Sequence, residues 1–132
     1  RRREANPMIK RPINQRFAES ILSERKTTTI RDFPWPVRTP IMLYHWSGKP
    51  YRSKHVDLAP IIVTGFWTIR IRHQKNGKMV YTCGKRSGPV LWWSEGFLGP
   101  YDMDAWFRDL VKPGETVTKC LMQFRHAKKG NR

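Results

Sequence analysis

A hairpin signal in the middle of the chain constrains the fold more than any other feature. The run "FWTIRIRH" (66–73) alternates apolar and polar side chains, which is typical of a strand with one buried face. Its two faces are Trp67, Ile69 and Ile71 on one side and Thr68, Arg70 and Arg72 on the other. The following "QKNGK" contains Asn-Gly, a strong hairpin signal, and "MVYTCG" has the composition of the return strand. This pattern favours an antiparallel sheet over a parallel βαβ arrangement.

Other segments predict four more strands and two helices. The strand-like segments are "MIKRP" (8–12), "TTTIR" (27–31), "IMLYHW" (41–46) and "TVTKCLMQF" (116–124), the last with Thr118, Cys120, Met122 and Phe124 on one face. The helical segments are "NQRFAESILSE" (14–24), with Asn14 as cap and Phe17, Ala18, Ile21 and Leu22 on one face, and "YDMDAWFRDLVKPG" (101–114). We expect Asp102 to cap the second helix, Pro113-Gly114 to end it, and its inner stripe to be Met103, Trp106, Phe107, Leu110 and Val111. Proline and glycine predict loops at 33–40 and 47–55.

The length of 132 residues suits one domain with a single core. Together the segments predict an α+β fold, a small, mostly antiparallel β-barrel of five to six strands with two short helices. The longest apolar run, "APIIVTGFW" (59–67), is too short to span a membrane, and no secretory signal is visible. We therefore expect a cytoplasmic protein, a monomer, without a membrane partner.

The formal charge of +16 is spread unevenly along the chain. Residues 1–16 carry +5 and residues 125–132 carry +4, which leaves +7 for the rest. This distribution predicts a basic N-terminal arm (1–8), a domain at 9–125 and a basic C-terminal tail (126–132). A basic body attracts polyanions such as nucleic acid, although a high isoelectric point also simply aids solubility.

The metal-binding residue types do not form a recognisable motif. Cys83 and Cys120 lie far apart without a Cys-x-x-Cys pair, and the four histidines are scattered at 45, 55, 73 and 126. We therefore predict neither a metal nor another cofactor. A disulfide has no support, and reduced thiols agree with a cytoplasmic setting.

The segment "RKTTTIRDF" (25–33) combines hydroxyls with closely spaced charges. A lysine whose pKa is lowered by burial and by neighbouring cations can activate a threonine hydroxyl. In a regular strand, however, Thr29 and Arg31 share one face, whereas Lys26 shares the other with Thr28 and Ile30. Lys26 and Thr29 therefore meet only if Lys26 precedes the strand or a bulge intervenes. The alternative is an exposed edge strand with solvated charges.

The motif in "INQRFAESILSERKTTTIRDFPWPV" resembles the opening motif of the ASCH family, within the PUA-like superfamily. The later "SEGF…MDAWFR" and its closing strand are similar to the second block of that family, so the resemblance covers about residues 9–125. It is strongest toward small bacterial ASCH amidohydrolases that act on N4-acetylcytidine and toward short ASCH-domain proteins of phages and prophages. It implies a PUA-like barrel in the cytoplasm of a bacterium, or of the host if phage-encoded.

The resemblance also implies a catalytic set. Thr29 would be the nucleophile, Lys26 its base and Glu95 the third member, while Arg31, with Arg25 beside it, would hold the substrate or the developing oxyanion. Glu95 is also the only acidic residue between Asp57 and Asp102, which equally suits a local salt bridge.

A second set of residues suits nucleic-acid binding, because aromatic rings stack on bases and cations contact phosphates. The set comprises Arg38, Lys49, Arg52, Lys54, Arg70 and Arg72, with Trp35 and Tyr51 as exposed aromatics. Three functions therefore stay open: hydrolysis of the N4-acyl amide of a cytidine-type nucleoside, RNA binding without catalysis, and RNA cleavage. The expected partner is RNA or a modified nucleoside.

Overall fold

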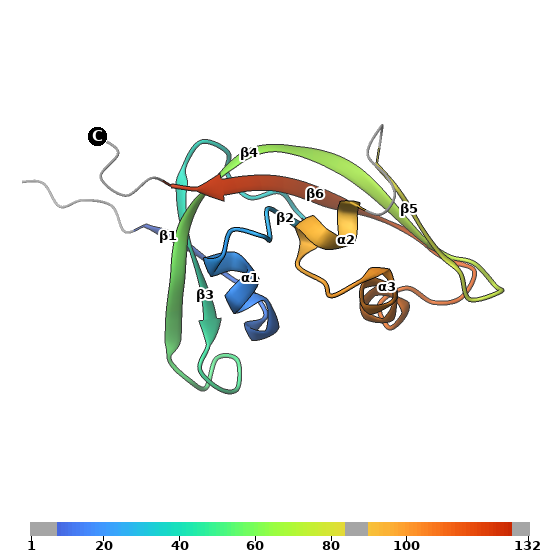
Figure 1. The fold of residues 1–132 in the computed structure, drawn as a ribbon, viewed down its shortest axis with the longest axis horizontal. Helices are drawn as coiled ribbons and strands as arrows, with labels where there is room; N and C mark the ends of the chain where they lie inside the picture. Colours follow the sequence, from blue (N-terminus) through green and yellow to red (C-terminus); the bar gives the residue numbers. More distant parts are fainter. Residues whose placement is uncertain (1–7, 84–89, 128–132) are drawn as a thin grey trace, which may run out of the picture.

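The computed structural model describes residues 8–83 and 90–127 (Figure 1). In chain order its elements are β1 (Ile9–Pro12), the 3-10 helix η1 (Gln15–Phe17), α1 (Ala18–Leu22), β2 (Thr28–Arg31), β3 (Pro40–Trp46), β4 (His55–His73), β5 (Met79–Thr82), α2 (Val90–Glu95), α3 (Pro100–Arg108) and β6 (Thr116–His126). The α+β class and the mostly antiparallel sheet are confirmed. The predicted arms lie almost entirely outside the described residues. The strand β6 extends beyond its expected end at Phe124 and includes His126, the first residue of the predicted tail. The Nε2 atom of His126 lies 2.8 Å from the main-chain oxygen of Ile21.

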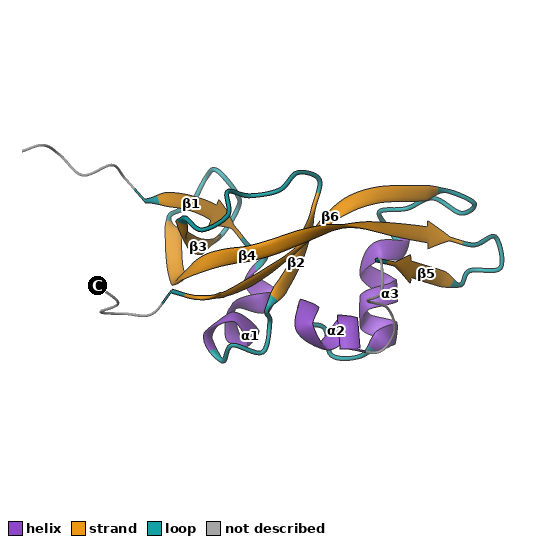
Figure 2. Cartoon of the chain, turned by 90° about the horizontal axis from the view of Figure 1, so that it is seen from above, coloured by secondary structure: helices purple, strands orange, loops and turns teal. Residues whose placement is uncertain are grey.

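The six strands form one strongly curved sheet (Figure 2). The order is β1-β3-β4-β6-β2, with β5 beside β4, and every pair is antiparallel except β1–β3. The sheet is barrel-like in its curvature but not closed, since β1 and β2 are its edges. The Arg31 side chain spans this gap, because its Nη2 donates to the main-chain oxygen of Pro12 at 2.8 Å. A side-chain hydrogen bond thus connects the two edge strands, which in a closed barrel would be joined by main-chain hydrogen bonds.

The predicted hairpin is present, but β4 is much longer than the pattern indicated. The turn closes through Gln74 N to the oxygen of Lys78 at 2.9 Å, with Gly77 at φ +91°. The strand begins at His55, eleven residues before the alternating run. Pro60 and Gly65 have the composition of strand breakers, and a bulge at Val63/Gly65 accommodates the irregular part of the strand.

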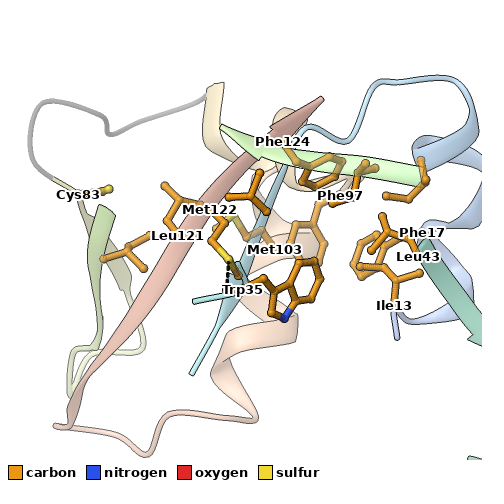
Figure 3. Close-up of a cluster of buried hydrophobic side chains, with 14 of the residues drawn as sticks. Ile13, Phe17, Trp35, Leu43, Cys83, Phe97, Met103, Leu121, Met122 and Phe124 are labelled. Atoms are coloured by element: carbon orange, nitrogen blue, oxygen red, sulfur yellow. Dashed lines mark hydrogen bonds between the residues drawn. The ribbon is translucent and has the colours of Figure 1, made fainter. Parts of the chain in front are cut away.

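This bulge changes the face of the sheet that is buried. Val63 pairs with Phe124 before the bulge, and Ile69 pairs with Lys119 after it. Val63 and Ile69 are an even number of residues apart on β4, whereas their partners are an odd number of residues apart on β6. Directly paired side chains share a face, so the buried residues of β4 lie on one face near β3 and on the other near β5. We call the place where the buried face changes the crossover. There, two consecutive residues of one strand are both buried. Leu121 and Met122 of β6 behave in this way, and Figure 3 shows them pointing to different sides.

The helices differ from prediction in several respects. Asn14 caps the first helical segment, since its Oδ1 accepts from Arg16 N, but the segment divides into η1 and α1 and leaves Leu22 exposed. The short α2 was not predicted. In α3, Gly99 is the N-cap, while Asp102 in the first turn accepts from Leu98 N at 2.8 Å. That helix ends at Arg108, before the Pro113-Gly114 stop, so Leu110 is exposed while Val111 still packs in the core. In the described residues no helix is long and apolar enough to cross a membrane.

Candidate functional site

The turn between α1 and β2 places Lys26 just before the strand. Glu24 has a left-handed φ of 64°, which ends the helical path, and Lys26 N donates to the oxygen of Ser20 at 2.9 Å. Thr27 N then donates to the oxygen of Ser94 at 2.8 Å, which attaches this turn to α2. The Lys26 side chain therefore enters the interior between α1, β2 and α2.

The Lys26 ammonium group is buried against main-chain oxygens and one carboxylate. The residue is 2% exposed, and its Nζ donates to the oxygens of Thr28 at 2.7 Å and of Glu95 at 2.6 Å. Glu95 Oε1 lies 3.8 Å from Nζ, and Nζ lies 4.6 Å from the centre of the Phe17 ring. Burial lowers the pKa of Lys26 to about 8; Glu95 opposes this shift, and Arg31, Arg25 and Arg16 add to it. At pH 7 about one lysine in ten is then neutral.

The two neighbouring threonine hydroxyls have different partners. Thr28 Oγ1 donates to Glu95 Oε2 at 2.5 Å and lies 3.1 Å from Ser94 Oγ. The hydroxyl of Thr29 instead accepts from Arg31 Nε at 3.2 Å. Both residues are buried because β2 pairs with β6 at the crossover, with Thr28 opposite Gln123 and Thr29 opposite Met122.

Lys26 and Glu95 are therefore brought together, and the hydroxyl beside them belongs to Thr28. We call these three residues the Lys26–Thr28–Glu95 cluster. Thr29, to which the ASCH resemblance gives the nucleophile's role, contacts Arg31 on the opposite face of β2. One signal in the sequence pointed to Thr28, because strand alternation puts Lys26 and Thr28 on the same face. No comparable signal in the sequence predicted the contact between the hydroxyls of Ser94 and Thr28.

The two arginines of the motif occupy different surroundings. Arg31 is held by the hydroxyl of Thr29, by the oxygen of Pro12 and by the Trp35 ring, whose centre lies 4.9 Å from the guanidinium carbon. Burial lowers the pKa of Arg31, and the charge of Glu95 opposes that shift. Arg25 lies over the Trp93 ring at 4.5 Å and donates to the main-chain oxygens of Trp93 and Phe97, both at 3.1 Å. Both arginines are half-buried, and of the two only Arg25 lines the cavity described next.

A cavity of about 850 Å³ lies beside the cluster. Its lining residues are Arg16, Glu19, Ser20, Ser23, Arg25, Trp92, Trp93, Gly96, Phe97, Leu98 and Asp102. Gly96 separates it from the lysine, since a Cβ atom at this residue would lie 3.2 Å from Lys26 Cδ and 2.9 Å from Ser20 Oγ. The cluster thus lies behind the wall of the cavity, with Arg25 on the cavity side.

The predicted nucleic-acid residues are exposed, with one exception. Arg38, Lys49, Arg52, Lys54, Arg70 and Arg72 all face solvent, as does Tyr51 at 87% exposure. The expectation that Trp35 is exposed was wrong. Trp35 is 8% exposed, lies beneath Arg31, and its main-chain N–H donates to Met122 Sδ at 3.0 Å. Its flanking prolines suggested a surface loop, but the ring covers the apolar interior near β6 (Figure 3).

The thiols and the potential metal ligands stay separate. No disulfide joins Cys83 to Cys120. Within residues 8–83 and 90–127, no three His, Cys, Asp or Glu side chains gather in a way that could hold a metal ion.

Comparison of the chain with protein-family models, curated proteins and solved structures gave no match. The ASCH resemblance therefore stays a prediction that rests on the motifs at 13–37 and 94–108.

Proposed function

We propose that this chain is an ASCH-type hydrolase that binds a nucleoside or an unpaired RNA base and cleaves an acyl amide on the exocyclic amine of cytidine. One observation carries the proposal: a buried lysine with a pKa near 8 lies against Glu95, and Glu95 accepts a hydrogen bond from a threonine hydroxyl. A nucleophile, a proton acceptor and a cation are the groups that acyl transfer requires.

The contacts favour a two-step reaction. The Thr28 hydroxyl attacks the amide carbon while its proton passes to Glu95, which already accepts that hydrogen bond. The C–N bond then breaks, the amine nitrogen takes the proton from Glu95, and the acyl group stays on Thr28 as an ester. Water hydrolyses the ester and releases the carboxylic acid, so cytidine and acetate are the products from N4-acetylcytidine. Lys26 would hold Glu95 beside β2 through its contacts with the carboxylate and the main-chain oxygen of that residue.

The ASCH resemblance supports a different assignment of the same groups. It gives the attack to Thr29 and the base to Lys26, whose lowered pKa suits that role. For that assignment the Thr29 hydroxyl would have to leave Arg31. Either assignment requires the wall around Ser94 and Gly96 to shift, because all three residues of the cluster are buried. Such closed arrangements often tighten or open only in the substrate complex.

Hydrolysis of N4-acetylcytidine, followed by chromatography, tests the proposal. We expect wild-type turnover, and we expect Lys26→Ala and Thr28→Val to lower kcat by about 10³-fold or more, while Thr29→Val stays within about threefold. Valine keeps the shape of threonine, so urea unfolding of each variant separates a lost hydroxyl from a lost fold. Loss in Thr29→Val with retention in Thr28→Val would transfer the nucleophile to Thr29. A folded wild-type protein without turnover would overturn the hydrolase function.

A specific observation also favours nucleic-acid binding as a second function. Six exposed cations have no ion-pair partner within the described ranges: Arg38, Lys49, Arg52, Lys54, Arg70 and Arg72. Arg70 and Arg72 lie on the same face of β4, where their partners in β6 are the uncharged Thr118 and Thr116. Unpaired cations of this kind neutralise phosphates.

A further inference from the structure

An aromatic stack at the end of the β3–β4 hairpin runs from the core to solvent. Tyr44 is buried and its ring stacks on that of His55, with centroids 3.8 Å apart and planes at 18°. Trp46 packs edge-on against His55 at 4.4 Å, and Tyr51 follows at 5.1 Å from Trp46. The last ring of this series is almost wholly exposed. The hairpin end therefore presents an aromatic surface that is supported from below by other rings.

The loop that carries Tyr51 is held in one conformation by its own hydrogen bonds. Ser47 N donates to the oxygen of Lys54 at 2.8 Å, and Gly48 N donates to Ser53 Oγ at 2.9 Å. Ser53 Oγ in turn donates to the oxygen of Lys49 at 2.8 Å. Tyr51 itself has a φ of 65°, the left-handed region that a non-glycine residue adopts only at a cost of about 1–2 kcal/mol. The backbone that carries the exposed ring is thus held in one conformation by the loop itself.

Three cations belong to the same loop as this ring, and no acidic residue lies among them in the sequence. Lys49, Arg52 and Lys54 are all exposed, and the sequence from 44 to 55 contains no Asp or Glu. The nearest acid along the chain, Asp57, is paired with Lys10 at 2.9 Å. An exposed aromatic face with adjacent unpaired cations complements a ligand that offers flat rings and negative charges together.

We propose that this surface, made of Trp46, Tyr51, Lys49, Arg52 and Lys54, binds single-stranded nucleic acid, with an unpaired base stacked on Tyr51 and the flanking phosphates on the three cations. A duplex offers phosphates but keeps its bases stacked inside, so it fits only the charged half of the surface. The inference extends the proposed nucleic-acid binding to a definite place and substrate class. It does not depend on hydrolysis at the Lys26–Thr28–Glu95 cluster.

The first test is fluorescence anisotropy with a labelled oligouridylate and with a duplex of equal phosphate number. We expect Tyr51→Ala to weaken oligouridylate binding about tenfold and leave duplex binding unchanged. Tyr51→Phe keeps the ring and should bind as wild type does. Equal affinity of Tyr51→Ala and wild type for the oligouridylate, or equal loss for both ligands, would overturn the stacking site.

The second test uses two triple variants that remove the same charge at different places. K49Q/R52Q/K54Q should reduce the slope of log affinity against log salt by about 2, since each phosphate contact on a single strand contributes about 0.7. The matched control K75Q/K78Q/K112Q changes three exposed lysines near the β4–β5 hairpin, which lies at the opposite end of the long axis from the β3–β4 hairpin (Figure 1). This control should leave the slope within about 0.5 of the wild-type value. Equal effects of the two variants would assign binding to overall charge and refute the site. Neither triple variant nor Tyr51→Ala should alter hydrolysis of free N4-acetylcytidine, so failure of this inference and failure of the hydrolase function are distinguishable.

Discussion

Replacing Lys26 by methionine should change how the stability of the protein depends on pH. Methionine has nearly the length of lysine and carries no charge, so it removes the titrating group while largely filling its space. Lys26 is suited to this experiment because burial lowers its pKa from the ordinary 10.5 to about 8. A pKa that differs between the folded and unfolded states makes the free energy of unfolding pH-dependent.

The direction of the effect follows from the two proton affinities. Below about pH 8, Lys26 is protonated in both states, and burying its charge lowers stability. Between pH 8 and pH 10.5 the folded protein has released the proton and the unfolded chain still holds it, so stability rises with pH. Above pH 10.5 Lys26 is neutral in both the folded and the unfolded state, and the free-energy cost of burying its charge disappears. The gap between the two pKa values corresponds to about 3 kcal/mol.

Urea unfolding of wild type and Lys26→Met, followed by circular dichroism at intervals from about pH 7 to pH 10.5, measures this effect. The difference between the two curves removes the contributions of all other groups in this highly basic chain. We expect wild type to gain about 3 kcal/mol on the variant across the range. Lys75→Met removes the same charge from an exposed position and is the control for the loss of a positive charge alone. A Lys26→Met curve that runs parallel to that of wild type would refute the burial of a charged Lys26.

Two further predictions concern the walls of the site and the open edge of the sheet. Gly96→Ala should lower stability by about 2–4 kcal/mol, because Gly96 has a φ of +95° and an added Cβ would lie 2.9 Å from Ser20 Oγ and 3.0 Å from Phe17 Cδ1. Gly77→Ala, with a φ of +91° and nothing within 4 Å, carries the backbone strain alone and should cost only about 1–2 kcal/mol in the same urea assay; equal losses would contradict the contact. Arg31→Lys should speed hydrogen exchange in β1 by about tenfold, since the bond to the Pro12 oxygen joins this edge to β2. Arg70→Lys is the control on an exposed strand position, and an unchanged exchange rate in Arg31→Lys would show that the edges hold without that bond.

Local patterns predicted the parts of the fold that local physics determines. Alternation and the Asn-Gly pair located the β4–β5 hairpin because strand pairing across a tight turn involves only neighbouring residues. The first half of β4 was missed because its proline and glycine are tolerated only through a bulge and through pairing with distant strands. The α2 helix was missed for a similar reason. It is six residues long, so the packing around it rather than its own propensity must stabilise it.

The candidate site shows the same division. The grouping of charge and hydroxyl at 25–31 was visible in the sequence, and the lowered pKa of Lys26 follows from burial and neighbouring cations, as expected. The partner of Glu95 depends on the register between β2 and β6 at the crossover, which no local pattern encodes. The burial of Trp35 likewise depends on Met122, 87 residues away in the sequence.

The pairing of β2 with β6 determines when the candidate site can form as the chain is synthesised. Residues 28–31 are synthesised well before their ladder partners at 120–123. The β3–β4 hairpin, whose strands are close in sequence, can form during synthesis, whereas the Lys26–Thr28–Glu95 cluster must await the arrival of β6 to be enclosed. Until β6 has been synthesised and has paired with β2, the Lys26 amine therefore stays in water, and its pKa falls only once that pairing encloses it.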